Sequence, residues 1–275
     1  GQEAPIIIAE VGQNHQGELD KALEYVKVFA ASGANVVKFQ TRNNKYLFSS
    51  DAYDKVYNSN NAFAEHYGAH REKLELNVEW LPVIKDECRK NGVKFMSTPF
   101  DEPSLDLICD VGVDIIKIAS FDLGNLPFIS KIADKGLPVV MSTGGGDLED
   151  VKASAEILRQ RVQDISILHC VSEYPCTHDR LGLETIQDYI DEFPDCRIGV
   201  SDHFNGILSG PVAYLLGARV FEKHVRLNKN LKSVDDFFSI TPDELKILRK
   251  ELDMIKDFKV KNTFLRTKNE IKNRI

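Results

Sequence analysis

The sequence lacks any paired-cysteine motif. Its five cysteines are an odd number, and none of them forms a C-x-x-C pair with another. Disulfide frameworks and structural zinc clusters both depend on cysteines matched in number and spacing. The pattern therefore argues against both, and it predicts reduced thiols in an intracellular protein. The cysteines are Cys88, Cys109, Cys170, Cys176 and Cys196.

Long hydrophobic runs and an excess of positive charge are also missing. No apolar stretch approaches the roughly 20 residues of a transmembrane helix, and no basic segment leads into an apolar one at the start. The net charge of −7 argues against nucleic acid or an anionic membrane as the main partner. We therefore expect a soluble cytoplasmic protein. A small anionic ligand remains possible, because a few lysines at one site can outweigh a distant acidic surface.

Short apolar segments of β type alternate with helix-type segments along the whole chain. The strand candidates are nearly continuous in Val, Ile and Leu, as expected for parallel strands covered on both faces. Eight such units predict a single (β/α)8 TIM barrel of the α/β class, with a doubly wound open sheet as the alternative. Glycine follows four of the helix candidates, as at helix ends. The strand candidates are residues 6–11, 35–40, 93–98, 114–119, 138–143, 165–170, 197–201 and 220–225, and the helix candidates are 19–32, 78–91, 104–111, 126–135, 148–160, 183–193, 207–216 and 242–258.

No internal domain boundary interrupts this alternation. We therefore predict one barrel over residues 1–258, followed by a basic linker or tail at 259–275. Residues 41–77 form a long polar segment between the second and third strand candidates. A loop of that length at the mouth of a barrel more often forms a lid or a wall of the substrate site than a segment without a role, so we expect it to cover the site.

Polar, chargeable residues gather at the ends of the last two strand candidates. One run ends in Ser201-Asp202-His203, and the next ends in Glu222-Lys223-His224. The carboxyl ends of barrel strands meet at the catalytic face, so His203 and His224 are predicted to lie together. Two histidines could hold one divalent metal with open coordination positions. The alternative is that each histidine is an ordinary core or helix-capping residue.

Lysines and hydroxyls recur at the other strand ends. Lys38, Lys117 and Lys223 stand in or beside apolar runs, where a positive charge is costly unless an anion meets it. They indicate either an anionic ligand or a lysine that forms a Schiff base. Hydroxyl groups near the glycine run 144–146 favour a phosphate as that anion. These hydroxyls belong to Thr98, Ser120, Ser142 and Ser201.

Seven motifs stand in an order that resembles the sialic acid synthase (NeuB) family. The resemblance covers nearly the whole barrel, and the motifs in combination are highly specific. They are Ala9-Glu10-Val-Gly-Gln-Asn14-His15, Val37-Lys38-Phe39-Gln40-Thr41, Ser97-Thr98-Pro99-Phe100-Asp101, Ile116-Lys117-Ile118-Ala-Ser120, His169-Cys170-Val-Ser-Glu-Tyr174-Pro175, Ser201-Asp202-His203 and Glu222-Lys223-His224.

The resemblance implies an enzyme that condenses phosphoenolpyruvate with an N-acetylmannosamine-like aldose. The product would be a nonulosonic (sialic-type) acid, with release of phosphate. The resemblance also implies a divalent metal, expected to be manganese with magnesium or cobalt as alternatives, and a homodimer. The implied roles are metal binding by His203 and His224; carboxylate binding by Lys38 and Thr98; phosphate binding by Lys117, Ser120, Ser142, Ser172 and Ser201; proton handling by Glu10 and Asp122; and sugar binding by Gln40, Tyr174 and Asp235.

Several positions depart from the family pattern, which leaves the sugar open. Residues 233–236 read Ser-Val-Asp-Asp where family members commonly have Gly-Pro-Asp-His. Ser172 and Phe204 stand where asparagine and threonine are usual in some members. The candidates for the sugar are N-acetylmannosamine and the diacetamido sugars that lead to legionaminic or pseudaminic acids. The antifreeze-like domain that usually follows in the family has no counterpart in this sequence.

Two other functions remain open at this stage. One is a barrel that binds a sugar or a phosphate without catalysis, and the other is a class I lysine aldolase. The pair of histidines and the phosphate-type hydroxyls favour the synthase over the aldolase.

Overall fold

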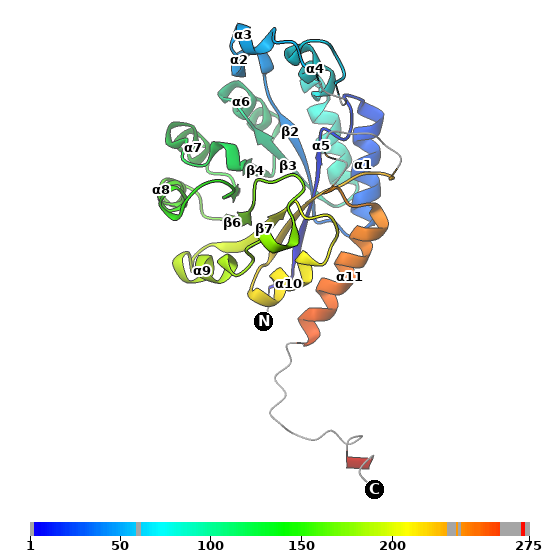
Figure 1. Ribbon diagram of the computed structural model, residues 1–275, viewed down its shortest axis with the longest axis vertical. Coiled ribbons are helices and arrows are strands. Elements are labelled where there is room, and N and C mark those ends of the chain that lie inside the picture. Colours follow the sequence, from blue (N-terminus) through cyan, green and yellow to red (C-terminus); the bar gives the residue numbers. More distant parts are fainter. Residues whose placement is uncertain (1–2, 59–61, 230–234, 236–237, 259–270, 273–275) are drawn as a thin grey trace.

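Eight parallel strands form a closed barrel in the computed structural model of the protein (Figure 1). The structure describes residues 3–58, 62–229, 235, 238–258 and 271–272. Strand order follows the sequence around the ring, and β8 pairs in parallel with β1, so the predicted barrel is confirmed and the open sheet is ruled out. The strands are β1 (Ile6–Gly12), β2 (Val36–Thr41), β3 (Lys94–Pro99), β4 (Ile115–Ile118), β5 (Val139–Ser142), β6 (Ile165–Cys170), β7 (Arg197–Asp202) and β8 (Val220–His224).

Helices surround the barrel and end where the sequence predicts. The four predicted glycines, Gly33, Gly92, Gly136 and Gly217, all have positive φ between 64° and 117°, which only glycine adopts readily. The predicted helix at 78–91 is in fact divided into a 3-10 turn and a helix, with Pro82 in the first turn of the helix, where proline is tolerated. The surrounding helices are α1 (Leu19–Ala31), η1 (Val78–Trp80), α5 (Leu81–Lys90), α6 (Glu102–Val111), η2 (Ser120–Asp122), α7 (Leu126–Ala133), α8 (Leu148–Arg159), η3 (His178–Arg180), α9 (Thr185–Glu192), α10 (Ser209–Leu216) and α11 (Pro242–Phe258).

The last helix completes the outer ring. Helix α11 lies beside α1 and α10, and it buries Leu245, Leu248 and Leu252 at helical spacing (Figure 1). Of the tail predicted at 259–275, only residues 271–272 lie within the described part of the chain, so that prediction remains untested. No helix among the described residues is both long enough and apolar enough to span a membrane.

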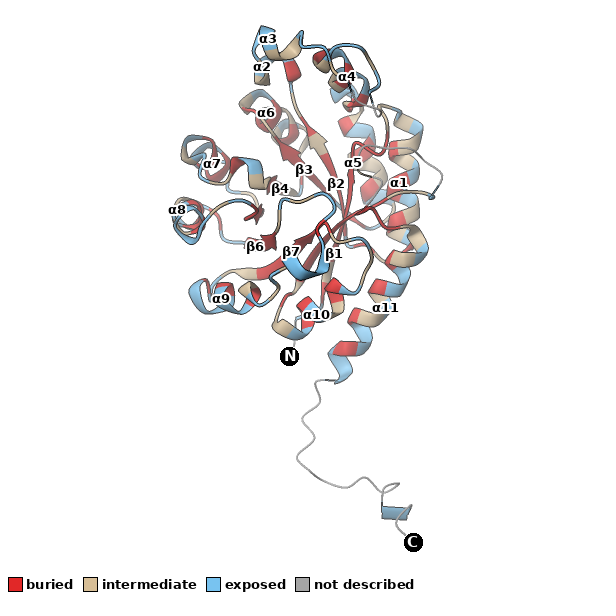
Figure 2. Ribbon diagram, viewed as in Figure 1, coloured by how far each residue is buried: buried red, intermediate tan, exposed pale blue. Residues whose placement is uncertain are grey.

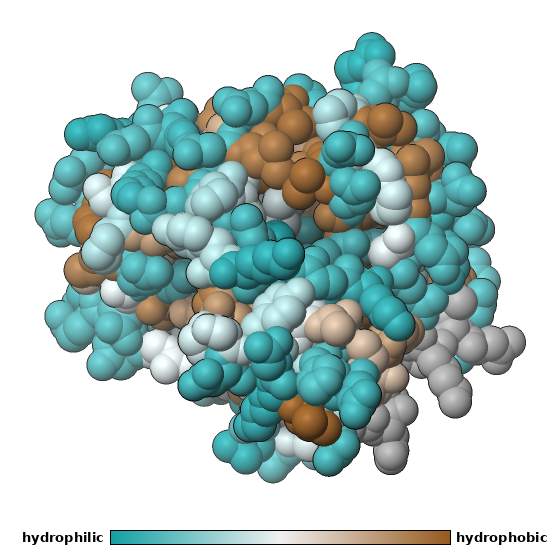
Figure 3. Space-filling model, turned by 90° about the horizontal axis from the view of Figure 1, so that it is seen from above, coloured by the Kyte–Doolittle hydropathy of each residue, from teal (hydrophilic) through white to brown (hydrophobic). Residues whose placement is uncertain are grey.

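The long polar segment between β2 and β3, which the sequence predicted as a loop, contains secondary structure of its own. It contains three short helices, α2 (Asn44–Leu47), α3 (Ser50–Tyr53) and α4 (Tyr67–Leu74). Aromatic rings form its small core: Tyr67 lies 5.3 Å from Phe48 and 5.4 Å from Tyr57 between ring centroids. Viewed from the side of these helices, the surface is mostly hydrophilic with separate apolar patches (Figure 3). We call this segment, residues 41–77, the β2–β3 insert.

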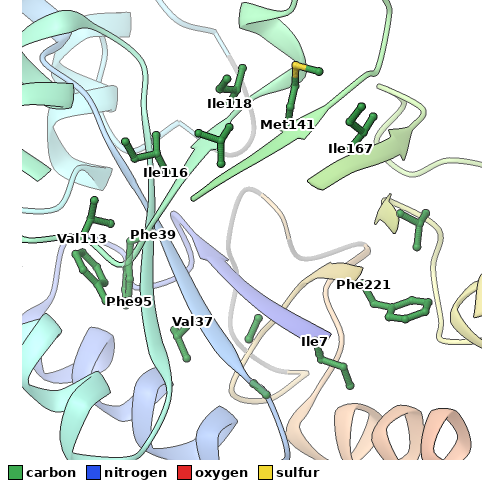
Figure 4. Packing of buried hydrophobic residues seen from close by; sticks show 14 of the residues in the cluster. Ile7, Val37, Phe39, Phe95, Val113, Ile116, Ile118, Met141, Ile167 and Phe221 are labelled. Carbon is green, nitrogen blue, oxygen red and sulfur yellow. The ribbon is translucent and has the colours of Figure 1, made fainter. Parts of the chain in front are cut away.

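Two apolar layers build the core. The larger lies between strands and helices, where Figure 4 shows side chains such as Val37, Ile116 and Phe221 projecting outward from the ring of strands. The smaller fills the barrel interior and consists of Ile8, Val36, Met96, Val140, Leu168 and Val220, with Ile6 and Ile115 packed against it. Figure 2 shows the strands buried and the outer faces of the helices exposed. The polar site lies directly above this interior layer, which forms its floor.

Candidate active site

A cavity of about 550 Å³ opens above the apolar floor of the barrel. Side chains two residues apart on a strand share a face, so each strand places a further inward residue above the floor. On β1, for example, Ile8 belongs to the floor and Glu10 lines the cavity. The other inward residues that line it are Lys38, Thr98, Lys117, Ser142, Cys170, Ser201 and Glu222. The location at the carboxyl ends of the strands is that of barrel active sites.

Paired charges occupy the base of this cavity. The Lys38 ammonium lies 3.4 Å from the Glu10 carboxylate and 3.2 Å from the Glu222 carboxylate. Lys117 approaches Glu222 at 3.7 Å, so Glu222 stands between both lysines. Lys38 also donates a hydrogen bond to the Thr98 hydroxyl at 3.3 Å. All four charged side chains are almost completely buried, which is tolerable only because they neutralise one another.

These ion pairs, together with burial, determine the pKa values of Glu222, Lys38 and Lys117. Burial opposes the charge on Glu222, but Lys117 and Lys38 outweigh burial and bring its pKa down to about 2. Burial likewise opposes the charge of Lys38, yet Glu10 and Glu222 raise its pKa above the usual range. For Lys117, burial prevails and lowers the pKa, since its only close carboxylate is shared with Lys38. The charge of Lys117 is therefore less compensated than that of Lys38, which has two carboxylates beside it.

Hydroxyl groups and a glycine form a second part of the cavity, next to Lys117. The Gly144 backbone N–H donates to the Ser120 hydroxyl at 2.9 Å. A Cβ atom at Gly144 would lie only 2.2 Å from the Ser172 hydroxyl oxygen, so only glycine fits between the two serines. The buried Ser142 hydroxyl has no hydrogen-bond partner in the described part of the chain. Such a set of donors suits a tetrahedral oxyanion.

The two predicted metal ligands stand together at the rim. The rings of His203 and His224 are 5.7 Å apart between centroids. A hydrogen bond of 2.8 Å joins His203 Nδ1 to the Val171 carbonyl, which directs the opposite nitrogen, Nε2, to other contacts. The buried Nδ1 of His224 has no hydrogen-bond partner among the described residues, and it lies 3.5 Å from the Asp235 carboxylate. An unpaired buried nitrogen beside a second histidine is an arrangement that fits a divalent metal.

The remaining rim residues connect the histidines to the charged base. Gln40 donates a hydrogen bond of 2.7 Å to Glu10. A Cβ atom at Gly12 would lie 2.9 Å from the Asp235 carboxylate, 3.5 Å from His224 Nδ1 and 3.6 Å from the Gln40 amide nitrogen, so these three groups surround one point. Tyr174 covers His203, with 4.1 Å between ring centroids. Despite the burial of Asp235, contacts with His224 hold its pKa below the usual range.

Every predicted site residue except Asp122 lines the cavity. Asp122 is the buried last residue of η2, where it accepts a hydrogen bond from Asn125 at 3.3 Å, so its geometry gives no support to a role in proton handling. Lys223, which the sequence grouped with the ligand-binding lysines, points to the outer side of the sheet and pairs with Asp202 at 2.8 Å. Its neighbours Glu222 and His224 point inward, as the alternation of a strand requires.

Sequence reasoning assigned no role to several residues that line the same cavity. Glu222 was recognisable, because it precedes His224 by two residues on one strand and therefore shares its face. Gln13, Arg42, Arg71 and Cys170 also line the cavity. The two arginines could not be recognised from the alternation of residues on a strand, because Arg42 follows β2 and Arg71 lies on α4 of the β2–β3 insert.

Comparisons with known proteins identify the family of the chain. The model of the NeuB family matches residues 25–262. The chain is 36% identical to the N-acetylneuraminate-9-phosphate synthase of Drosophila melanogaster over 88% of its own length and 65% of that protein. It is also 36% identical to the N,N'-diacetyllegionaminic acid synthase of Campylobacter jejuni, over 88% of this chain and 74% of that one.

A solved structure shows the same fold. The N-acetylneuraminic acid synthetase of Leptospira borgpetersenii, in complex with citrate, superposes with a TM-score of 0.86 at 30% identity. The similarity covers 99% of this chain and 91% of that one.

Proposed function

The chain belongs to the NeuB family, and we propose that its barrel condenses phosphoenolpyruvate with an N-acetylmannosamine-like aldose to a nonulosonic acid, with release of phosphate. The observation that supports this most strongly is one cavity that joins three groups. These are a buried lysine pair, a cluster of hydroxyls beside Gly144, and two histidines at the rim. Each group matches one part of the reaction: the anionic donor, its phosphate and the electrophilic aldehyde.

Phosphoenolpyruvate would lie across the base of the cavity. In this arrangement Lys38 and Thr98, joined at 3.3 Å, meet the carboxylate. Lys117 and the hydroxyls of Ser120, Ser142, Ser172 and Ser201 meet the phosphate. The incomplete compensation of Lys117 leaves it able to bind a further negative charge.

The reaction joins C3 of phosphoenolpyruvate to the aldehyde carbon of the sugar. Electrons leave the double bond for the new C–C bond, and C2 becomes cationic. The π electrons of the aldehyde move to its oxygen, which takes up a proton and becomes a hydroxyl group of the product. Water adds to C2, loses a proton, and the C–O bond to phosphate then breaks to give the 2-keto acid. The Glu10 carboxylate, held by Gln40 at 2.7 Å and Lys38 at 3.4 Å, is placed to stabilise the cation and to take a proton.

His203 and His224 would hold the divalent metal, which we propose to be manganese with magnesium or cobalt as alternatives. When bound, the metal supplies Lewis acidity toward the aldehyde oxygen. Gln40, Tyr174 and Asp235 would orient the sugar beside the two histidines. Of residues 233–236, only Asp235, which matches the family pattern, lies within the described residues, and the three departing positions lie outside them. We also propose a homodimer that acts in the cytoplasm, where phosphoenolpyruvate is made.

The experiment that tests the proposal is an assay of phosphate release from phosphoenolpyruvate across a panel of aldoses with manganese present. Release that depends on a 2-acetamido aldose supports the synthase. A barrel that binds without catalysis would give no release with any aldose. The lowered pKa of Lys117 favours a lysine aldolase as the second candidate, and a lysine adduct trapped by borohydride would identify it.

A further inference from the structure

We infer that Arg42 and Arg71 form a binding site for a phosphate group at the end of the acceptor sugar that is remote from its aldehyde. This inference rests on the proposed synthase function. Both side chains line the active-site cavity, although neither comes from the inner face of the barrel. Arg42 directly follows β2, and Arg71 lies on α4 of the β2–β3 insert. We call these two residues the arginine pair.

The arginine pair stands on the side of the cavity assigned to the sugar. Arg42 donates a hydrogen bond to the side-chain oxygen of Gln40, whose amide nitrogen is bonded to Glu10. Arg71 donates to Gln13, in the loop after β1, at 3.1 Å. The hydroxyls around Gly144 follow β4, β5 and β6, which lie across the ring from β1 and β2. The arginine pair is therefore placed for a second anionic group rather than for the phosphate of phosphoenolpyruvate.

The charge of the arginine pair is only partly balanced. Glu75 lies 3.3 Å from Arg42 and 3.5 Å from Arg71, so one carboxylate serves both guanidinium groups. Burial also raises the pKa of Glu75 to about 7 despite the opposing effect of Arg42, and the carboxylate is therefore only partly ionised near neutral pH. The Asp235 carboxylate, which also interacts electrostatically with Arg42, lies 3.5 Å from His224. A net positive charge remains at the mouth of the cavity.

Both guanidinium groups also retain unused donors. Their side chains are only 9% and 13% exposed; the Arg42 Nε atom lies 3.3 Å from Glu75, and the buried Nε atom of Arg71 has no hydrogen-bond partner within the described residues. Arg42 stacks over the Phe100 ring at 4.1 Å, which fixes the plane of its guanidinium group. Two fixed guanidinium groups that face one cavity match the oxygens of a phosphate monoester.

The names of the relatives show that the family makes two kinds of product. The Drosophila relative is a 9-phosphate synthase, whereas the Campylobacter relative is named for an acid without phosphate. Phosphoenolpyruvate supplies three carbons to the proposed product, so a phosphate on C9 would come from C6 of the sugar. The arginine pair therefore favours a 2-acetamido aldose with a phosphate ester on its terminal carbon.

The test compares N-acetylmannosamine with its 6-phosphate as acceptors for the parent protein, Arg42→Met and Arg71→Met. The parent should use the phosphorylated acceptor with the lower KM. Each substitution should raise that KM about ten- to a hundredfold, as for the loss of a charge-assisted hydrogen bond. Arg71→Met should leave the KM for N-acetylmannosamine within about twofold. Arg42→Met also removes the hydrogen bond to Gln40, so it should raise the KM for the phosphorylated acceptor more than the KM for N-acetylmannosamine. Arg180→Met is the matched control, because Arg180 pairs with Glu173 on the surface and does not line the cavity. It should change neither KM.

Glu75→Gln is expected to change the KM for the phosphorylated acceptor in the opposite direction. Removing the competing negative charge should lower the KM for the phosphorylated acceptor. Turnover of N-acetylmannosamine by each variant reports that the barrel is folded.

Equal effects of the arginine substitutions on both acceptors would assign the pair a structural role and overturn the inference. A raised KM for phosphoenolpyruvate instead would assign the pair to the donor phosphate and also overturn it. If no aldose supports phosphate release by the parent, the proposed function fails, and this inference fails with it.

Discussion

The Lys38 ammonium group lies 3.2 Å from the Glu222 carboxylate in the interior of the barrel. This ion pair joins residues far apart in the sequence, since Lys38 is on β2 and Glu222 is on β8, the two strands that flank β1. Because Lys117 lies 3.7 Å from the same carboxylate, Glu222 is a shared counter-ion of both lysines that we assign to phosphoenolpyruvate.

Replacing Glu222 by glutamine should therefore destabilise the fold. The substitution leaves two buried lysines beside each other, and breaking a buried ion pair costs about 3–5 kcal/mol. Denaturant unfolding measures the loss. Glu102→Gln is a matched control, because its ion pair with Lys131 is half exposed and contributes less than about 1 kcal/mol. An equal, small effect of both substitutions would contradict the assignment of Glu222 as the shared counter-ion.

Replacing Lys117 by alanine should weaken the binding of phosphoenolpyruvate. The loss of a charge-assisted contact corresponds to a KM raised about ten- to a hundredfold, with a possible decrease in kcat. Steady-state kinetics at saturating aldose measure both constants. A KM for phosphoenolpyruvate equal to that of the parent would remove Lys117 from the phosphate site.

Replacing His203 by alanine should abolish tight metal binding and leave the barrel folded. The residue stands at the rim, outside the apolar layers, so its loss affects the site more than the core. Binding of manganese to the chelated, dialysed protein can be measured by titration calorimetry, with circular dichroism as the check on folding. His178→Ala is the control, since His178 lies in η3 and does not line the cavity. Unchanged manganese affinity in His203→Ala would show that the metal lies elsewhere.

The raised pKa of Glu75 predicts a pH dependence of stability. Its pKa is about 7 in the fold against an ordinary value of 4.5, because burial disfavours the charged form. The neutral carboxyl is thus favoured by folding, and its contribution is fully present below pH 4.5 and is lost as the pH rises through 7. Glu75→Gln stays neutral throughout. The difference in unfolding free energy between the variant and the parent should therefore shift in favour of the variant between pH 4.5 and 8. A difference that does not vary with pH would contradict the shift.

The sequence predicted the barrel because its strands are buried on both faces and therefore read as unbroken apolar runs. It predicted the strand-end residues for a related reason: a lysine or glutamate is rare inside such a run, so Lys38 and Lys117 stand out. Lys223 stood out in the same way, yet it faces outward to Asp202, because position along a strand does not by itself give the face. Counting alternate positions from His224 would have selected Glu222 instead.

The part of the site that comes from the β2–β3 insert could not be predicted. Its sequence is polar, and its few aromatic residues are far apart until the fold brings Tyr67 against Phe48 and Tyr57. The position of Arg71 over the cavity depends on that packing. Asp122 was selected because it follows the fourth strand and because the family resemblance implied its role, but its side chain accepts a hydrogen bond from Asn125 and does not line the cavity.

The most direct test of the proposed synthase function is to run the reaction in water enriched in oxygen-18 and to measure whether the released phosphate carries the label. The proposed chemistry breaks the C–O bond of phosphoenolpyruvate, so phosphorus-31 NMR should show released phosphate without the label. Release should require both a 2-acetamido aldose and the divalent metal. Labelled phosphate, or release at the same rate without any aldose, would contradict the assignment of this barrel as a condensing synthase.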